Sequence, residues 1–395
     1  MKNSKPNLTL RYAYIQGFFW MSFAAVMGFT SIYLLDAGFT NTQIGLLIAA
    51  AGTVSAFLQP ALAVYADKPD SPSLKKIILI LTAVLLTSSA ILFLLYQRSM
   101  LLTGLLFGVC ITVLQLLTPF MNALGMESIN QGKKLNFGVS RGMGSVAYAL
   151  ASYALGAIVA AAGEITVPVT MILVYVVFLI AVLCFPFTKI KKNPSVSAEK
   201  AAENPPAFFR QYKRFGIVLI GWMLLYISHV LLNSFTFQII ESKGGGSSEM
   251  GISMALSALI ELPTLFLFGY MVKKVRCDIW VRISGIFFML KALGSLLVTS
   301  ILPFYFIQAL QIGGWALITV ASVYYVNSIM KEQDAIKGQA YFTMTYTFGS
   351  VLAALLGGYL IDKAGVNAML LFAAGAAFIG MLIVLFSAER TEIIV

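Results

Sequence analysis

The stretch that decides the fold is KIKKNPSVSAEKAAENPP, residues 189–206, which is charged and proline-bearing within an otherwise apolar chain. Such a segment cannot bury enough apolar surface to form a core, so it predicts a linker. Six long apolar stretches precede it and six follow it. We therefore expect an N-terminal six-helix bundle over residues 1–188, a cytoplasmic linker over 189–213 and a C-terminal six-helix bundle over 214–395.

Composition places the chain in a membrane. Its 395 residues are 59% hydrophobic and 11% charged, with a mean hydropathy of +0.88, whereas about 25% of the residues of a soluble domain are charged. A hydrocarbon core about 30 Å thick needs roughly 20 apolar residues per helix. The sequence therefore predicts an all-α membrane protein whose twelve transmembrane helices form two pseudo-symmetric bundles. The predicted spans are residues 10–35, 42–66, 76–97, 100–129, 138–162, 166–187, 214–241, 248–272, 280–300, 302–329, 338–361 and 366–387.

The positions of the basic residues predict the orientation. A net charge of +11 would indicate a nucleic-acid partner in a soluble protein, but here the positive-inside rule accounts for it. With a cytoplasmic N-terminus, pairs such as Lys75-Lys76 and Lys273-Lys274 fall inside. The basic residues left outside are Arg98, Lys243 and Lys363. We expect a multi-pass protein of the bacterial inner (cytoplasmic) membrane, with both termini cytoplasmic, the lipid bilayer as a partner and no nucleic-acid partner.

Residues for cofactor chemistry are scarce. The chain has one histidine and three cysteines, so neither a disulfide framework nor a Cys/His metal site is expected. The run from Gly244 to Ser248 lacks the lysine and the strand context of a phosphate-binding loop. We expect no metal, no cofactor and no ATP-driven pump. With no catalytic constellation in sight, an enzyme is not expected either.

Three pairs of short motifs recur at an offset near 205 residues. Residues 42–45 (Thr-Gln-Ile-Gly) match residues 248–251 (Ser-Glu-Met-Gly), and Gly144-Ser145-Val146 recurs as Gly349-Ser350-Val351. A third pair, Asp67-Lys68 and Lys273-Lys274, lies 22 residues after Gly45 and Gly251 respectively. Three matches in nearly one frame favour a parallel duplication. Duplicated halves around a midplane site are the architecture of secondary transporters.

Five ionisable side chains lie inside predicted spans: Glu127, Arg141, His229, Glu261 and Lys291. A charge at the bilayer centre costs at least about 2.5–3.5 kcal/mol. We therefore expect these residues to face a wet cavity or one another. They are the leading candidates for a functional site.

Motifs around the first bundle resemble a known family. Leu58-Gln59-Pro60, followed by Tyr65-Ala66-Asp67-Lys68, and the segment Asn136-Phe137-Gly138-Val139-Ser140-Arg141 are similar to signatures of the major facilitator superfamily. The resemblance points in particular to the branch that holds lactose permease and the phenylpropionate-permease-like proteins. It implies a gating loop at Asp67 and Lys68, although Pro69-Asp70-Ser71-Pro72 replaces the usual glycine after them. The alternative is that Asp67 only caps a helix end.

The same resemblance implies a binding site around Arg141. It implies that Arg141 pairs with Glu127 to hold sugar hydroxyls and that Tyr148, where lactose permease has a tryptophan, stacks on the sugar ring. A guanidinium fork with a carboxylate can bind a polyol without net buried charge, and a spacing of seven residues keeps Tyr148 on the face of Arg141. The alternative is an ion pair that only latches two helices, with Tyr148 as packing.

Two charged residues of the second bundle match charged family positions. The resemblance places Glu261 on helix eight and Lys291 on helix nine, where they could bind substrate together, with Glu261 as the coupling acid. The alternative is a structural Glu261–Lys291 salt bridge that never titrates. On helix ten, Gln311 and Gly314 stand where lactose permease has a histidine and a glutamate, so its route of proton coupling does not carry over.

Neutral polar residues complete the candidate site. His229 could titrate near neutral pH and serve proton coupling, or it could be a hydrogen-bonded packing residue. Asn233 and Gln311 could read substrate hydroxyls, or could join helices through hydrogen bonds.

Together these features predict a transporter that works by alternating access. The expected function is proton-coupled uptake (symport) of a sugar or glycoside, with the proton gradient as energy source, by a protein that acts as a monomer. Alternatives are a proton-coupled carrier of an organic or aromatic acid or of a nucleoside, and an efflux antiporter. A sensor or scaffold without transport is the alternative from another class, because fold alone does not fix function.

Overall fold

The computed structural model describes residues 8–68, 70–96, 98–188 and 205–393, and describes the backbone alone at 67, 205–207, 332, 333 and 336. Over these residues the chain forms helices and no strand. Eleven helices are long and apolar enough to cross a membrane, or twelve if one bent pair counts as a single span. That pair, Leu8–Gly28 and Thr30–Asp36, bends by 46°. The predicted all-α membrane fold is confirmed.

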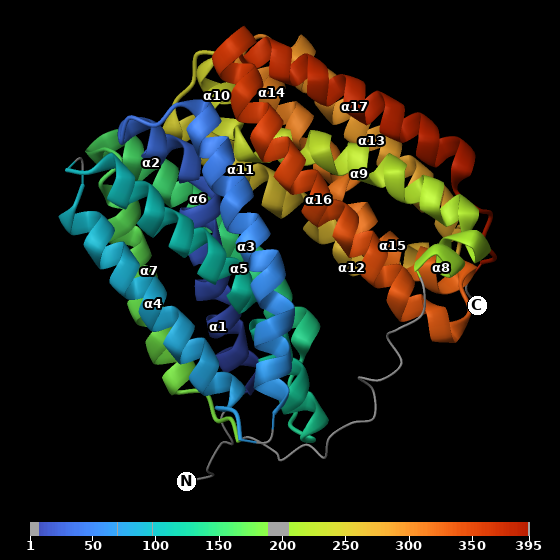
Figure 1. Ribbon diagram of the computed structural model, residues 1–395, viewed down its shortest axis with the longest axis horizontal. Helices are drawn as coiled ribbons and strands as arrows, with labels where there is room; N and C mark the ends of the chain where they lie inside the picture. Colours follow the sequence, from blue (N-terminus) through green and yellow to red (C-terminus); the bar gives the residue numbers. More distant parts are fainter. Residues whose placement is uncertain (1–7, 69, 97, 189–204, 394–395) are drawn as a thin grey trace. The chain divides into compact units, whose positions relative to one another are not determined.

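The helices fall into two compact units (Figure 1). Unit 1 comprises Met1–Phe39 and Ala50–Val196. Within it, α1 packs on α6 and α7, and α4 packs on α5 and α7. The helices of its sequence range are α1 (Leu8–Phe23), the π-helix η1 (Ala24–Gly28), α2 (Thr30–Asp36), α3 (Asn41–Asp67), α4 (Leu74–Leu94), α5 (Met100–Asn130), α6 (Phe137–Ala162) and α7 (Thr166–Leu183).

Unit 2 comprises Thr40–Ala49, which is the start of α3, and Ser197–Val395. Within it, α9 packs on α16 and α17, and α13 packs on α15 and α17. Helix α8 lies inside the stretch 189–213 that was predicted as a linker. The helices are α8 (Pro205–Gln211), α9 (Lys213–Ser234), α10 (Thr236–Glu241), α11 (Ser247–Ile260), α12 (Leu262–Met271), α13 (Cys277–Leu297), α14 (Ile301–Gln308), the 3-10 helix η3 (Ala309–Ile312), α15 (Trp315–Ile329), α16 (Glu332–Ala364) and α17 (Val366–Ser387).

Two predicted spans of unit 2 are broken in the middle. Helix α11 ends at Ile260 and α12 begins at Leu262, because Pro263 lacks an N–H and its ring clashes with a carbonyl of the preceding turn. The tenth span passes from α14 through η3 and over Gly313-Gly314 into α15. Irregular backbone at membrane depth is tolerated where it is buried in protein or lines a cavity. Both breaks lie in the candidate site described below.

Glycines at matched positions allow two helices to approach closely in each unit. A Cβ on Gly144 would lie 2.5 Å from Cδ1 of Trp20, which belongs to α1. A Cβ on Gly349 would lie 3.3 Å from Cβ of Tyr226, which belongs to α9. Both glycines open the Gly-Ser-Val motif that recurs in the sequence, so each half uses it to bring a helix close to its first helix.

A basic residue near the start of a helix caps the end of another helix in each unit. Lys75 Nζ donates to the carbonyls of Leu183 and Phe185 at the end of α7, at 2.7 and 2.9 Å. In unit 2, the Arg282 guanidinium donates to the carbonyl of Leu385 near the end of α17 at 3.1 Å and to that of Ala388 just beyond it at 2.6 Å. These bonds satisfy carbonyls that a helix end leaves open. The two contacts are similar in kind, and the duplication stays a prediction.

Candidate functional site

In unit 1, three side chains of α1 form a hydrogen-bonded row at four-residue spacing. The Tyr12 hydroxyl donates to the carbonyl of Met121 at 2.7 Å. Gln16 Nε2 donates to the Tyr12 oxygen at 2.7 Å, and Trp20 Nε1 donates to Gln16 Oε1 at 3.1 Å. Tyr12 and Gln16 are buried. We call Tyr12, Gln16 and Trp20 the α1 row. Its side chains lie on one face of the helix and hold one another through hydrogen bonds.

Arg141 lies at the end of this row. Its guanidinium carbon is 3.9 Å from the centre of the Trp20 ring, and its Nη1 donates to Ser145 Oγ at 3.4 Å. Helix α6 begins just before it, where the Asn136 side chain accepts a hydrogen bond from the Val139 N–H at 3.0 Å. This cap sets the direction of the first turn of α6, from which Arg141 projects.

The predicted Glu127–Arg141 ion pair stays a prediction. The Arg141 guanidinium lies over the Trp20 ring, and Gly144 leaves room for the indole. Glu127 is half-buried on α5, and Tyr148 is half-buried on α6. The binding roles of Glu127 and Tyr148 stay predictions, and the aromatic ring on which Arg141 stacks is Trp20.

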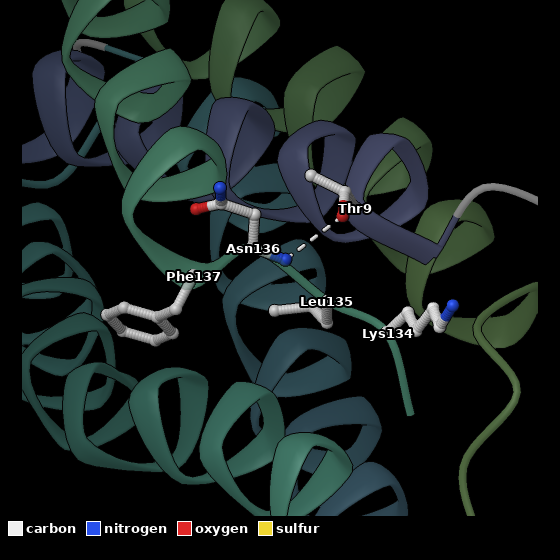
Figure 2. Close-up of a pocket in the computed structure, with 5 residues that line it drawn as sticks. All are labelled: Thr9, Lys134, Leu135, Asn136 and Phe137. Carbon is white, nitrogen blue, oxygen red and sulfur yellow. Dashed lines mark hydrogen bonds between the residues drawn. The ribbon is translucent and has the colours of Figure 1, made fainter. Parts of the chain in front are cut away.

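A shallow hollow lies at the start of α6. It encloses about 470 Å³ and is lined by Thr9, Lys134, Leu135, Asn136 and Phe137. Figure 2 shows how the Asn136 backbone N–H reaches Thr9 Oγ1, which accepts its hydrogen bond at 3.0 Å. The hollow is wide open and holds none of the five ionisable candidates, so we do not assign the site to it.

In unit 2, an amide connects the two charged candidates. Lys291 Nζ on α13 donates to Gln311 Oε1 at 2.6 Å, and Gln311 Nε2 donates to Glu261 Oε1 at 2.9 Å. Lys291 is 3% exposed and Gln311 is 4% exposed. Glu261 lies at the break between α11 and α12, and Gln311 lies in η3. We call Lys291, Gln311 and Glu261 the relay.

The relay places the Gln311 amide between Lys291 and Glu261, and the binding and coupling roles of these two charged residues stay predictions. An amide offers both donors and an acceptor, so Gln311 satisfies the cation and the carboxylate at once. A buried charge that lacks such a partner is costly. The sequence predicted all three residues as candidates. It did not predict that Gln311 would lie between the other two.

His229 is held between an aromatic ring and an amide. Its ring is parallel to that of Trp315, with centroids 4.5 Å apart and an interplanar angle of 6°, and it meets the edge of Phe288 at 5.3 Å. Asn233 Nδ2 donates to the His229 carbonyl at 2.9 Å and lies 3.0 and 3.2 Å from the two ring nitrogens. The sequence analysis missed Trp315. The feature of the sequence that could have pointed to Trp315 is its place directly after Gly313-Gly314.

The predicted gating residues lie at the end of α3. Asp67 is the last residue of the helix, and its side chain is outside the described part of the structure. The Lys68 carbonyl accepts hydrogen bonds from the N–H and the hydroxyl of Ser71, at 3.1 and 2.7 Å. The serine thereby closes a turn in the loop after α3. The gating role of Asp67 and Lys68 stays a prediction.

Comparison with known proteins gives one family and several solved structures of the same fold. The model of the MFS_1 like family matches residues 9–374. Among solved structures, a point mutant of the nucleoside transporter NupG superposes with a TM-score of 0.80 at 14% identity, covering 97% of this chain and 100% of that one. A bacterial homologue of the human lysosomal transporter Spinster, inward-facing and occupied, gives 0.69 at 13%, covering 98% and 97%.

A third structure has the same fold. An auto-inhibited peptide transporter of the POT family superposes with a TM-score of 0.67 at 13% identity, covering 98% of both chains. At these identities the superpositions show the fold alone. No curated protein matches the chain.

Proposed function

The chain belongs to the MFS_1 like family, whose fold is that of major facilitator superfamily transporters, and from this premise we propose that it takes up a sugar or glycoside together with protons by alternating access. The observation that carries the proposal is the relay. A lysine, an amide and a carboxylate meet where two spans break, and such breaks are how transporters of this kind build a polar site at membrane depth.

The chemistry of the relay favours a hydroxyl-bearing solute. A sugar hydroxyl is both a donor and an acceptor, as the Gln311 amide is. It can therefore replace or extend the bridge between Lys291 and Glu261 without leaving either charge unsatisfied. A hydrophobic cation offers no acceptor to Lys291, which is 3% exposed, so this site disfavours it.

Proton coupling is assigned to Glu261, with His229 as the second candidate. A protonated carboxyl keeps one acceptor oxygen for Gln311 but loses its charge, so the attraction across the relay weakens. The protonation of Glu261 and the binding of a solute thus act on the same three side chains, so each can change the affinity of the relay for the other. His229 is buried against Trp315 and Phe288, and a proton there would be less accessible.

The substrate class is tested by binding. Purified protein is heated with a panel of sugars, glycosides, nucleosides and aromatic acids, and the rise in thermal midpoint is recorded. A ligand that binds only the folded state raises the midpoint through mass action. We expect stabilisation by one sugar or glycoside that is lost in Gln311→Leu. Stabilisation by aromatic acids alone would contradict the proposed substrate class.

A nucleoside is the second candidate. The observation that favours it is the parallel stack of His229 on Trp315, because a planar ring stacked on an aromatic side chain is also how a nucleobase is bound. Competition separates the two candidates: a nucleoside that displaces every sugar in the panel, and loses affinity in Trp315→Leu, would favour this second function.

A further inference from the structure

We infer that Trp20 is the positioning residue of Arg141 and that Gln16 and Tyr12 hold Trp20 in place. The sequence analysis assigned this task to Glu127 and left Trp20 and Tyr12 without a role. The inference rests on the proposed function only in so far as Arg141 contacts the solute. Its geometric part, the stacking of the guanidinium on the indole, stands on contacts within unit 1.

The contact with Trp20 restricts where the guanidinium lies. An arginine side chain has several rotatable bonds, so a charge partner alone leaves its orientation loose. A guanidinium carbon 3.9 Å from the ring centre of Trp20 brings the cation against the negative face of the indole. A guanidinium presents its N–H groups in one plane, and a ring that holds it in place directs that plane toward neighbouring hydroxyls or a carboxylate, which it can bind bidentately.

The indole itself is fixed from two sides. Its N–H donates to Gln16, and Gln16 donates to Tyr12, which donates to a carbonyl of α5. Gln16 is 1% exposed and Tyr12 is fully buried, so water does not compete for these bonds. On the other side Gly144 lies against the pyrrole part of the ring, where a Cβ would lie 2.5 Å from Cδ1.

Because Trp20 offers both an aromatic face to Arg141 and an N–H to Gln16, an aliphatic residue could not replace it in positioning Arg141. Leucine at this position would stay apolar but would lose the ring face, the N–H and part of the packing volume. Phenylalanine would keep an aromatic face and lose the N–H and one ring of the indole. The pair of variants therefore separates the effect of an aromatic face from that of the hydrogen bond.

The first arm of the test needs no substrate. The chain has four tryptophans, so replacing Trp222, Trp280 and Trp315 by phenylalanine leaves Trp20 as the only emitter. We expect Arg141→Leu to shift its emission maximum, because a cation above the ring acts on the excited indole. Tyr148→Phe is the matched control and should leave the emission unchanged. An emission maximum that is the same with and without Arg141→Leu would overturn the inference.

The second arm measures uptake in the otherwise wild-type chain. We expect Trp20→Leu to raise KM about tenfold with little change in the maximal rate, and Trp20→Phe to stay within about threefold. Trp280→Phe, which removes a tryptophan of unit 2, is the control for the loss of an indole. Equal KM values for Trp20→Leu and wild type would contradict the positioning role.

A double variant decides whether Trp20 acts through Arg141. On an Arg141→Lys background, Trp20→Leu should change KM by less than about twofold, because residues that act as a unit are not additive. A full tenfold effect on that background would show that Trp20 acts independently and would overturn the inference. If no solute of the panel is transported, the emission arm still decides the geometry, and only the proposed function fails.

Discussion

At the scale of single residues, Gln311 matters most because it bonds to both charged side chains of the relay, one of which, Lys291, is buried. Its carbonyl accepts from Lys291 and its amide donates to Glu261. No sequence pattern marks this amide as a bridge, since the pairing depends on where η3 places it relative to α11 and α13.

Gln311→Leu should abolish uptake and lower the free energy of unfolding by about 3 kcal/mol, because it leaves a buried charge without its partner. The measurement is the thermal midpoint in detergent together with uptake into proteoliposomes. The matched control is Gln308→Leu, which removes an amide bonded to the neutral Ser257 hydroxyl and should cost only about 1 kcal/mol. Equal losses in the two variants would show that the relay charges are not what Gln311 supports.

Glu261→Gln should remove proton-driven accumulation while keeping solute exchange down a gradient. A glutamine keeps an acceptor for Gln311 but cannot take up a proton, so binding survives and coupling does not. The measurement is counterflow compared with uptake driven by an inward proton gradient. Retained proton-driven accumulation would move the coupling role to His229 or elsewhere.

At the scale of elements, the start of α3 is held by a carboxylate of α16. Asp362 accepts four hydrogen bonds there: from the N–H and side-chain amide of Asn41 at 3.2 and 2.9 Å, and from the N–H and hydroxyl of Thr42 at 2.7 and 2.6 Å. The nearby glycines allow this approach, since a Cβ on Gly358 would lie 2.1 Å from the Asn41 carbonyl oxygen.

Asp362→Ala should lower the free energy of unfolding by about 1 kcal/mol, the usual cost of losing a helix N-cap. Asp362→Asn keeps one acceptor oxygen and should lose less. The adjacent exposed Lys363 provides the control, because Lys363→Ala removes no bond to α3. A chemical or thermal melt that ranks Lys363→Ala as more damaging than Asp362→Ala would contradict the capping role.

The helices themselves could be predicted, whereas their interruptions could not. The predicted spans 42–66 and 138–162 agree with α3 and α6 to within a residue, because the length of an apolar stretch is a local signal. The stretches 248–272 and 302–329 were predicted as single helices and are broken. Proline and paired glycines permit such breaks, but whether a break forms depends on what packs against it.

At the scale of the whole molecule, each unit carries a polar cluster of its own kind. Unit 1 has an arginine on an indole, and unit 2 has a relay of three side chains beside a histidine stacked on tryptophan. The matched Gly144 and Gly349 fit the predicted duplication, whereas the polar side chains of the two units differ. In the proposed function, the cluster of unit 1 binds the solute and that of unit 2 also couples it to protons.

The sequence located the charged residues of both clusters because charges inside apolar spans are conspicuous. It missed Trp20, Tyr12 and Trp315, because aromatic residues in a membrane span are usually lipid-facing or interfacial. The four-residue spacing of Tyr12, Gln16 and Trp20 is the signal that was available. The role of this spacing became clear only from the contacts of the row with other helices, which the sequence of one span does not contain.

The central claim is that proton movement and solute movement are coupled through Glu261. The most direct test is the pH inside proteoliposomes, read with a trapped dye while a sugar or glycoside from the binding panel is added outside. The account predicts that the interior acidifies with wild-type protein and that it does not with Glu261→Gln. Solute entry without acidification in the wild type would contradict it.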